Sequence, residues 1–209
     1  MSYQTDEEKA EAIKKWWRDN GVAVIAGLAL GLVIIFGWRY WTDYRNDLAA
    51  QASTHFEQML YSAEDTDAAT VLAKQSEQLD ADFGATPYAA LGALIAAKGL
   101  YQAGDAEAAI ARLERVVDDA PDAALARLAA LRLARVQLAE GALDAAESTI
   151  AAHDDSPEFS ADFAAVRGDL AAARGDLATA RDAYQTAIEG GAALSQLIQL
   201  KLDNLPSAG

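Results

Sequence analysis

The chain has 209 residues, 32 acidic against 17 basic side chains, a net charge of −15 and no cysteine. The absence of cysteine excludes disulfides, thiolate catalysis and cysteine-based zinc sites. The first 45 residues hold six acidic and six basic side chains, so the whole net charge lies on residues 46–209. This acidity argues against nucleic acid as a partner, because the phosphate backbone is also negative.

An uncharged, apolar stretch covers residues 21–38. As a helix it is about 27 Å long, which matches the hydrocarbon core of a bilayer. Indole rings favour the head-group layer, and all four tryptophans stand at the two ends of the stretch, at Trp16, Trp17, Trp38 and Trp41. The alternatives are a buried core helix, which would not sort tryptophan in this way, and a cleaved signal peptide, which would be followed by small residues. We predict a transmembrane helix over residues 21–41 behind a cytoplasmic segment, residues 1–20.

The basic residues that flank this span are unevenly divided between its two sides. Four precede it and two follow it, namely Lys9, Lys14, Lys15 and Arg18 against Arg39 and Arg45. Because positive charge is retained on the cytoplasmic side, we expect the N-terminus inside and a domain of residues 42–209 outside. The predicted localisation is a bacterial inner membrane, crossed once, with the domain in the periplasm.

Small residues form a stripe within the predicted span. Gly27 and Gly31 make a G-x-x-x-G pattern, and Ala23 lies one turn earlier. Such a stripe allows the backbone of another membrane helix to approach closely. We predict a lateral helix contact at these three residues, although glycine is common enough in membrane helices for the pattern to arise by chance.

The domain begins with two amphipathic stretches, residues 43–61 and about 66–80, which read as a degenerate first helix pair. A turn glycine then recurs at Gly104, Gly141 and Gly175, at intervals of 37 and 34 residues. A period near 34 with two helices in each unit is typical of tetratricopeptide repeats. Pro87 suits the first turn of the helix that opens the regular part.

Residue sizes around each turn glycine agree with this period. Small residues lie seven positions before and five positions after the glycine, and a large apolar residue lies nine after it: Ala97, Ala109 and Leu113; Ala134, Ala146 and Ile150; Gly168, Ala180 and Tyr184. Small residues let paired helices cross closely. We predict an all-α protein: an N-terminal transmembrane helix, then a tetratricopeptide-like α-solenoid of about three to four helix pairs. Its C-terminal capping helix carries Leu194, Leu197, Ile198, Leu202 and Leu205. The alternative is a non-repeating helical bundle.

The concave face of such a solenoid is lined by the first helix of each pair. Projected on this chain, the rule predicts a protein-binding surface at Leu91, Lys98, Tyr101, Leu128, Arg135 and Leu138. Leu94, Leu131, Asp162 and Asp169 extend the same projection. The groove would be mildly apolar with two basic points inside an acidic domain. The alternative is that several of these leucines are ordinary core.

Signatures of catalysis are missing from the sequence. There is no nucleophile elbow, no zinc-protease or phosphate-binding loop motif and no dinucleotide fingerprint. His55 and His153 lie 98 residues apart, and the aspartate pairs lack the spacing of a calcium loop. We predict no enzymatic activity, no cofactor, no metal site and no small-molecule substrate.

Several runs together resemble the YfgM family of ancillary subunits of the SecYEG translocon. They are GWRYW at residues 37–41, LRLARVQ at 131–137, residues 162–168, Gly175 with Asp176, and the tail at 194–205. The resemblance extends over almost the whole chain, and it implies a role beside the translocon.

The resemblance implies SecYEG and a PpiD-like periplasmic chaperone as protein partners, with unfolded exported chains as further candidates. The expected function is a membrane-anchored adaptor that helps transfer exported proteins to periplasmic chaperones. The alternative is a membrane-anchored regulatory protein that sequesters a stress-response or envelope-assembly component.

Overall fold

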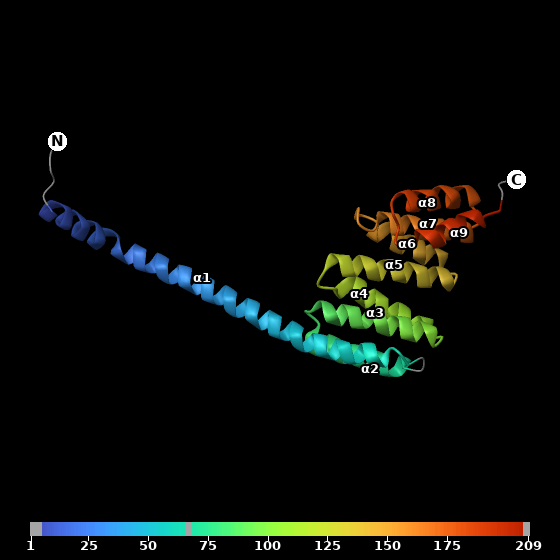
Figure 1. Ribbon diagram of the computed structural model, residues 1–209, viewed down its shortest axis with the longest axis horizontal. Coiled ribbons are helices and arrows are strands. Elements are labelled where there is room, and N and C mark those ends of the chain that lie inside the picture. Colours follow the sequence, from blue (N-terminus) through green and yellow to red (C-terminus); the bar gives the residue numbers. More distant parts are fainter. Residues whose placement is uncertain (1–5, 66–67, 207–209) are drawn as a thin grey trace. The chain divides into compact units, whose positions relative to one another are not determined.

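The computed structural model describes residues 6–65 and 68–206, and within these residues every regular element is a helix, joined to the next by a short turn or loop. The described residues form α1 (Asp6–Ser62), α2 (Ala69–Phe83), α3 (Pro87–Gln102), α4 (Ala106–Asp119), α5 (Ala123–Ala139), α6 (Leu143–His153), α7 (Ser160–Ala173), α8 (Leu177–Glu189) and α9 (Ser195–Asp203) (Figure 1). The predicted all-α class is confirmed.

The chain divides into two compact units, residues 1–48 and 49–209. The first unit is the long part of α1, the one helix among the described residues that is long and apolar enough to cross a membrane. Its large apolar side chains, such as Val22, Leu28 and Phe36, are exposed. Helix α1 runs without a break past residues 20 and 41, so the limits of the cytoplasmic, membrane and domain segments remain predictions.

Aromatic side chains gather at both ends of the apolar part of α1. The rings of Trp38 and Trp41 lie 5.4 Å apart between centroids, and the Arg45 guanidinium stands 4.9 Å from the Trp41 ring centre. Trp16 and Trp17 are paired in the same way at the other end, 6.4 Å apart. This arrangement fits an interfacial belt in which arginine reaches toward water along an aromatic face.

The last part of α1, residues 49–62, belongs to the second unit. Ala52 and Met59 are fully buried there, and the Phe56 ring lies 5.7 Å from the ring of Tyr88 in α3. Helix α2 spans Ala69–Phe83 and so ends later than the predicted 66–80, because it extends to a buried Phe83. The predicted start at Thr66 falls outside the described residues.

Each of the three predicted turn glycines follows the end of a helix, and its own backbone is in the left-handed conformation. The φ angles are +88° at Gly104, +76° at Gly141 and +80° at Gly175. After α3 the Gly104 N–H donates to the Tyr101 carbonyl and the next N–H donates to the Leu100 carbonyl, which is a Schellman turn. A fourth turn of this kind at Gly191, φ +75°, joins α8 to α9 and was not predicted.

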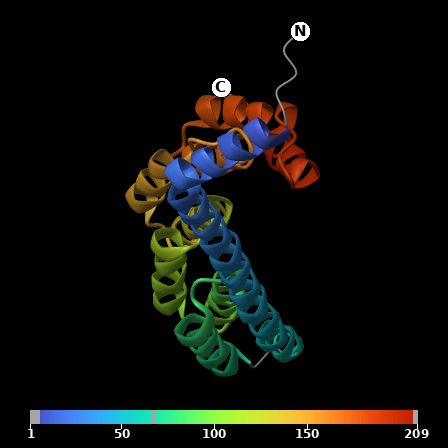
Figure 2. The same ribbon diagram turned by 90° about the vertical axis from the view of Figure 1, so that its left-hand side faces the viewer.

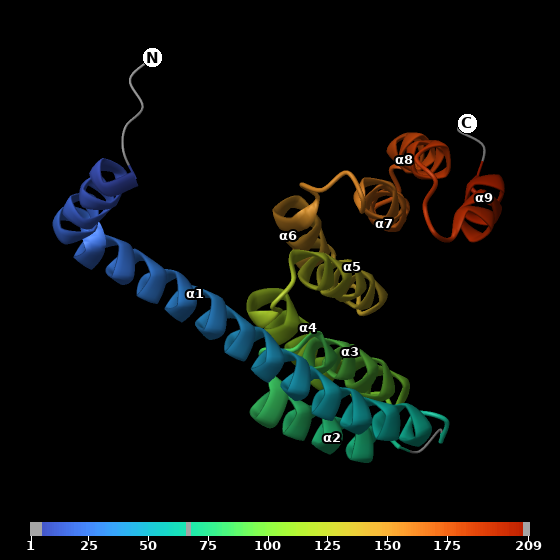
Figure 3. The same ribbon diagram turned by 60° about the vertical axis from the view of Figure 1, so that its left-hand side comes forward.

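Helices α3 and α4, α5 and α6, and α7 and α8 pair as hairpins, and α3, α5 and α7 also pack on one another in sequence. Figures 2 and 3 show the hairpins of residues 49–209 stacked in chain order. The predicted small positions are buried, with Ala97, Ala134 and Gly168 at the crossings, and Leu113, Ile150 and Tyr184 fill the gaps beside them with at most 3% exposure. The repeat pattern and the solenoid are confirmed.

The tight contact between α7 and α8 at Gly168 is tested by Gly168→Ala. A Cβ at position 168 would stand 2.5 Å from Cε1 of Tyr184. Helix propensity alone favours alanine by about 0.5–1 kcal/mol, whereas overpacking costs about 1–3 kcal/mol. We therefore expect a net loss in the free energy of unfolding, measured by urea denaturation of the full chain.

The control for this prediction is Ala173→Gly at an exposed position in the last turn of α7. This substitution changes only the helix propensity, so it should lower the free energy of unfolding by less than about 1 kcal/mol. A stabilised Gly168→Ala variant would show that the helices separate freely at this crossing.

Candidate functional site

Two adjoining hollows form a groove along the first helices of the pairs. The first hollow, between α3, α4 and α5, has a volume of about 260 Å³. The second, between α5, α7 and α9, has a volume of about 470 Å³. Arg135 lines both. We call the two together the docking groove.

The residues that line the first hollow are spaced so that they share one face of their helix. Leu94, Ala97, Lys98 and Tyr101 recur at intervals of three and four residues on α3, which puts them on one face. Arg132, Arg135 and Val136 do the same on α5, and Leu113 of α4 closes the floor. Leu94 and Leu113 are 2% exposed, whereas Lys98 is exposed. The hollow therefore has an apolar floor and a basic rim.

Partial burial perturbs two side chains in this hollow. It lowers the pKa of Arg132, and the neighbouring positive charge of Arg135 lowers that pKa further. It raises the pKa of Tyr101, and the Glu140 carboxylate beside the tyrosine hydroxyl raises that pKa as well. Both shifts follow from charges and polar groups held partly away from water.

The second hollow is mostly apolar, with Leu138, Leu194, Leu197 and Ile198 in its lining. Leu194 and Leu197 are about half exposed. The hollow's carboxylate, Asp169, is already engaged. Lys201 of α9 donates to both oxygens of Asp169, at 2.7 and 2.8 Å, and the Tyr184 hydroxyl donates to Oδ1 at 2.7 Å.

This network joins three helices: Asp169 lies on α7, Tyr184 on α8 and Lys201 on α9. Partial burial, and then the hydrogen bond to Asp169, raise the pKa of Tyr184 well above its ordinary value. The α9 wall of the groove is therefore held by a charged contact in addition to the packing of Ile198, which is 3% exposed.

The structure separates the six predicted groove residues into four groups. Lys98 and Tyr101 line the first hollow, Leu138 lines the second, and Arg135 lines both. Leu91 and Leu128 are half-buried against the core shared by α3, α4 and α5, and neither lines the two hollows of the docking groove.

Two leucines of the wider projection belong to the core. Leu94 forms the floor of the first hollow, while Leu131 packs in the core with Phe163, at 4% exposure. Asp162 accepts a hydrogen bond from the Ala193 N–H, at 3.2 Å. For Leu131 the core alternative holds.

Two features of the docking groove were missed by sequence reasoning. Arg132 lines the first hollow three residues before Arg135, a spacing that the sequence does contain. Leu194, Leu197 and Ile198 were predicted only as a cap, yet they form a wall of the second hollow.

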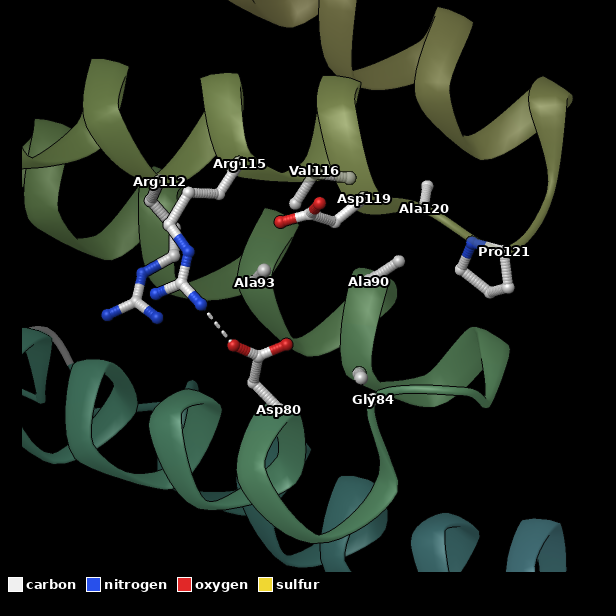
Figure 4. A pocket seen from close by; sticks show the side chains of 11 residues that line it. Asp80, Gly84, Ala90, Ala93, Arg112, Arg115, Val116, Asp119, Ala120 and Pro121 are labelled. Carbon is white, nitrogen blue, oxygen red and sulfur yellow. Dashed lines mark hydrogen bonds and ion pairs between the residues drawn. The ribbon is translucent and has the colours of Figure 1, made fainter.

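A smaller cavity between α2, α3 and α4 has a volume of about 30 Å³ (Figure 4). Figure 4 shows Arg112 and Arg115 side by side above Asp80. Arg115 forms an ion pair with Asp80, and Arg112 pairs with Glu77 at 3.1 Å. The cations of this cavity are thus neutralised by α2, and the contacts join two helix pairs.

A further hollow of about 420 Å³ lies between α6, α7 and α8, outside the docking groove. Its arginines are also paired. Arg174 contacts Asp144 at 2.9 Å and Glu147 at 2.8 Å, and Arg167 pairs with Asp154. The Arg174 guanidinium lowers the pKa of Glu147.

The residues of the predicted helix contact lie in the exposed part of α1. Nothing stands within 4 Å of the Cβ position at Gly27 or at Gly31, so side chains of a neighbouring helix can reach the backbone there. The described residues contain no cluster of three or more histidine, cysteine, aspartate or glutamate residues that could hold a metal ion.

The chain has one long apolar helix followed in sequence by a solenoid of helix hairpins. It is therefore of the class of tetratricopeptide-like proteins that carry a candidate membrane anchor. The family model described as a tetratricopeptide repeat-like domain matches residues 14–207. No solved structure shows a significant match to the chain.

Three curated relatives cover nearly the whole chain. The proteins of Haemophilus influenzae and Aggregatibacter actinomycetemcomitans are 33% and 34% identical to it over 207 residues, which is 98% of this chain and 100% of theirs. The Escherichia coli protein is 30% identical over 205 residues, 97% of this chain and 98% of its own. All three are named ancillary SecYEG translocon subunit. The chain belongs to this family.

The titration of Tyr184 tests the network that holds α9. A tyrosine in the unfolded chain ionises near pH 10, whereas the folded chain keeps Tyr184 protonated to higher pH. As the pH rises above about 10, the unfolded state loses a proton that the folded state retains, so the free energy of unfolding falls. We expect Tyr184→Phe to reduce this loss in urea unfolding measured between about pH 9 and 11.

Tyr61→Phe is the matched control, because Tyr61 is 76% exposed and stands outside the network. It should keep the wild-type dependence of stability on pH. Equal slopes for wild type and Tyr184→Phe would contradict the proposed contribution of the Tyr184 hydroxyl.

Proposed function

We propose that the chain is a membrane-anchored adaptor that associates with the SecYEG translocon and helps transfer exported proteins to periplasmic chaperones such as PpiD. The observation that carries this proposal is the docking groove, whose lining includes exposed leucines and basic side chains within an acidic domain. The printed name of the three relatives supports the association with SecYEG.

In this proposal residues 21–41 span the inner membrane, residues 1–20 lie in the cytoplasm and residues 42–209 form the periplasmic domain. Support comes from the exposed apolar surface of α1 and from the paired tryptophans at its two ends. The excess of basic residues before the span supports the orientation.

The docking groove takes a segment of a protein partner, either part of a chaperone or part of an exported chain. A segment laid along the groove would meet the basic rim of the first hollow and then the leucine wall that α9 supplies to the second. Grooves of this kind bind by inserting a few side chains into hollows while the rest of the segment excludes water.

Crosslinking in intact cells tests this function directly. A photo-reactive residue in place of Tyr101 should form adducts with translocon or chaperone subunits. Arg135→Glu with Tyr101→Ala should leave helicity unchanged and reduce recovery of these partners roughly tenfold, because the groove loses a cation and an aromatic contact. The control is Lys74→Glu, an exposed position on α2 outside the groove.

Full partner recovery with the double variant would place the docking site elsewhere on the chain. Recovery of a soluble regulator through residues 1–20, with no translocon adduct, would favour the regulatory alternative.

The stripe of Ala23, Gly27 and Gly31 is the proposed contact with a membrane helix of the translocon or chaperone. Replacing both Gly27 and Gly31 with isoleucine fills the open backbone surface, so we expect partner recovery from detergent-solubilised membranes to fall several-fold. Since each residue turns the helix by about 100°, Ala29, which lies two residues from each glycine, faces away from both, and Ala29→Ile is the control that adds bulk on another face. Unchanged recovery with the glycine variant would remove the stripe from the proposal.

A further inference from the structure

Some basic side chains of the domain form ion pairs with carboxylates and others do not. Residues 49–209 contain 11 lysines and arginines. Six of them contact carboxylates: Arg112, Arg115, Arg127, Arg167, Arg174 and Lys201. Arg181 donates to the carbonyl of Pro206, at 3.3 Å. Within the part of the chain that the structure describes, the remaining four have no ion pair, namely Lys74, Lys98, Arg132 and Arg135.

Three of these four, Lys98, Arg132 and Arg135, line the first hollow. This clustering runs against the composition, since the domain has far more carboxylates than cations and pairs five of its other six arginines with carboxylates. Arg132 and Arg135 lie one helical turn apart on α5, where like charges destabilise a helix. Partial burial, and then the repulsion from Arg135, lower the pKa of Arg132.

The nearby carboxylates do not neutralise this set. Asp169, in the adjoining hollow, is bonded by Lys201 and Tyr184. Glu140 lies beside the Tyr101 hydroxyl and forms no ion pair with the three cations in the described structure. An unpaired, partly desolvated guanidinium gains most from an anion that completes its hydrogen bonds.

We propose that the first hollow of the docking groove binds an acidic segment of a protein partner, with its carboxylates on Arg132, Arg135 and Lys98. An apolar side chain of the same segment rests on the floor made by Leu94 and Leu113. This inference builds on the proposed adaptor function and assigns the partner chemistry of its groove.

The charge of the domain selects a protein segment over other anions. A membrane surface or a nucleic acid would face a domain with a net charge of −15 over residues 46–209 and would be repelled. A single extended segment can enter the hollow while the rest of its chain remains outside. Arg135 also lines the second hollow, so the apolar continuation of that segment lies against Leu194 and Leu197.

Fluorescence anisotropy with the full-length protein in detergent micelles tests this assignment. The probe is a labelled short peptide in which leucine alternates with aspartate, and its partner probe has asparagine in place of each aspartate. We expect the acidic peptide to bind and the amide peptide to bind at least roughly tenfold more weakly, because the cations recognise charge.

Arg132→Gln with Arg135→Gln should weaken binding of the acidic peptide roughly tenfold or more, with unchanged far-ultraviolet circular dichroism. Arg132→Lys with Arg135→Lys keeps the charge and should retain most of the binding. Lys74→Gln removes an unpaired cation outside the groove and should bind as the wild type does.

Absence of acidic-peptide binding, equal binding of the two peptides, or an unchanged affinity in the double glutamine variant would each overturn the proposal. Tighter binding of the soluble lipid head group glycerophosphoglycerol than of the acidic peptide, measured by displacement of the peptide, would assign the cations to lipid instead. If crosslinking from position 101 persists in the double glutamine variant, the groove still docks proteins and only the acidic specificity is lost. Absence of translocon and chaperone adducts with the otherwise wild-type protein, crosslinked from position 101, would instead contradict the adaptor function.

Discussion

The close approach of paired helices is the constraint on which the domain depends. Ala97, Ala134 and Gly168 stand where the helices of a pair cross, and each lacks the bulk that would push them apart. Gly168 is the extreme case, because the ring of Tyr184 occupies the space of a side chain. The docking groove lies between successive first helices, with Leu113 of α4 in the floor of its first hollow and α9 as a wall of its second.

Electrostatics then distinguish the groove from the rest of the surface. Arginines at the joints between helix pairs, such as Arg112 and Arg174, meet carboxylates of a neighbouring helix. Each of these ion pairs has at least one partner exposed to water, and each contributes little alone, but together they pair most of the arginines outside the groove with carboxylates. The positive charge that remains is concentrated where a partner would enter. An acidic domain can in this way repel most polyanions and still offer one basic opening.

The sequence was sufficient to predict the features that repeat. Gly104, Gly141 and Gly175 could be recognised because the left-handed turn after each first helix favours glycine. Gly191 was missed because it lies only 16 residues after Gly175, where the period breaks and α9 packs on α8 instead of opening another helix pair. Features set by helix rotation were also harder to predict. Leu131 and Arg132 are adjacent, and only packing against Phe163 decides that the leucine faces the core while the arginine faces the hollow.

The burial of Ala52 and Met59 in the domain core has a consequence for how the domain can be isolated and assembled. The segment that leaves the apolar part of α1 also supplies the first layer of the stack, where the Met59 sulfur comes within 3.3 Å of the Cβ position at Gly92. A soluble fragment that starts after Ser62 would leave Leu79 and its neighbours facing water, and would be prone to aggregate. Helices α2 and α3 therefore depend for part of their cover on residues 49–62 of α1, so the candidate membrane span and the first layer of the solenoid belong to one continuous helix.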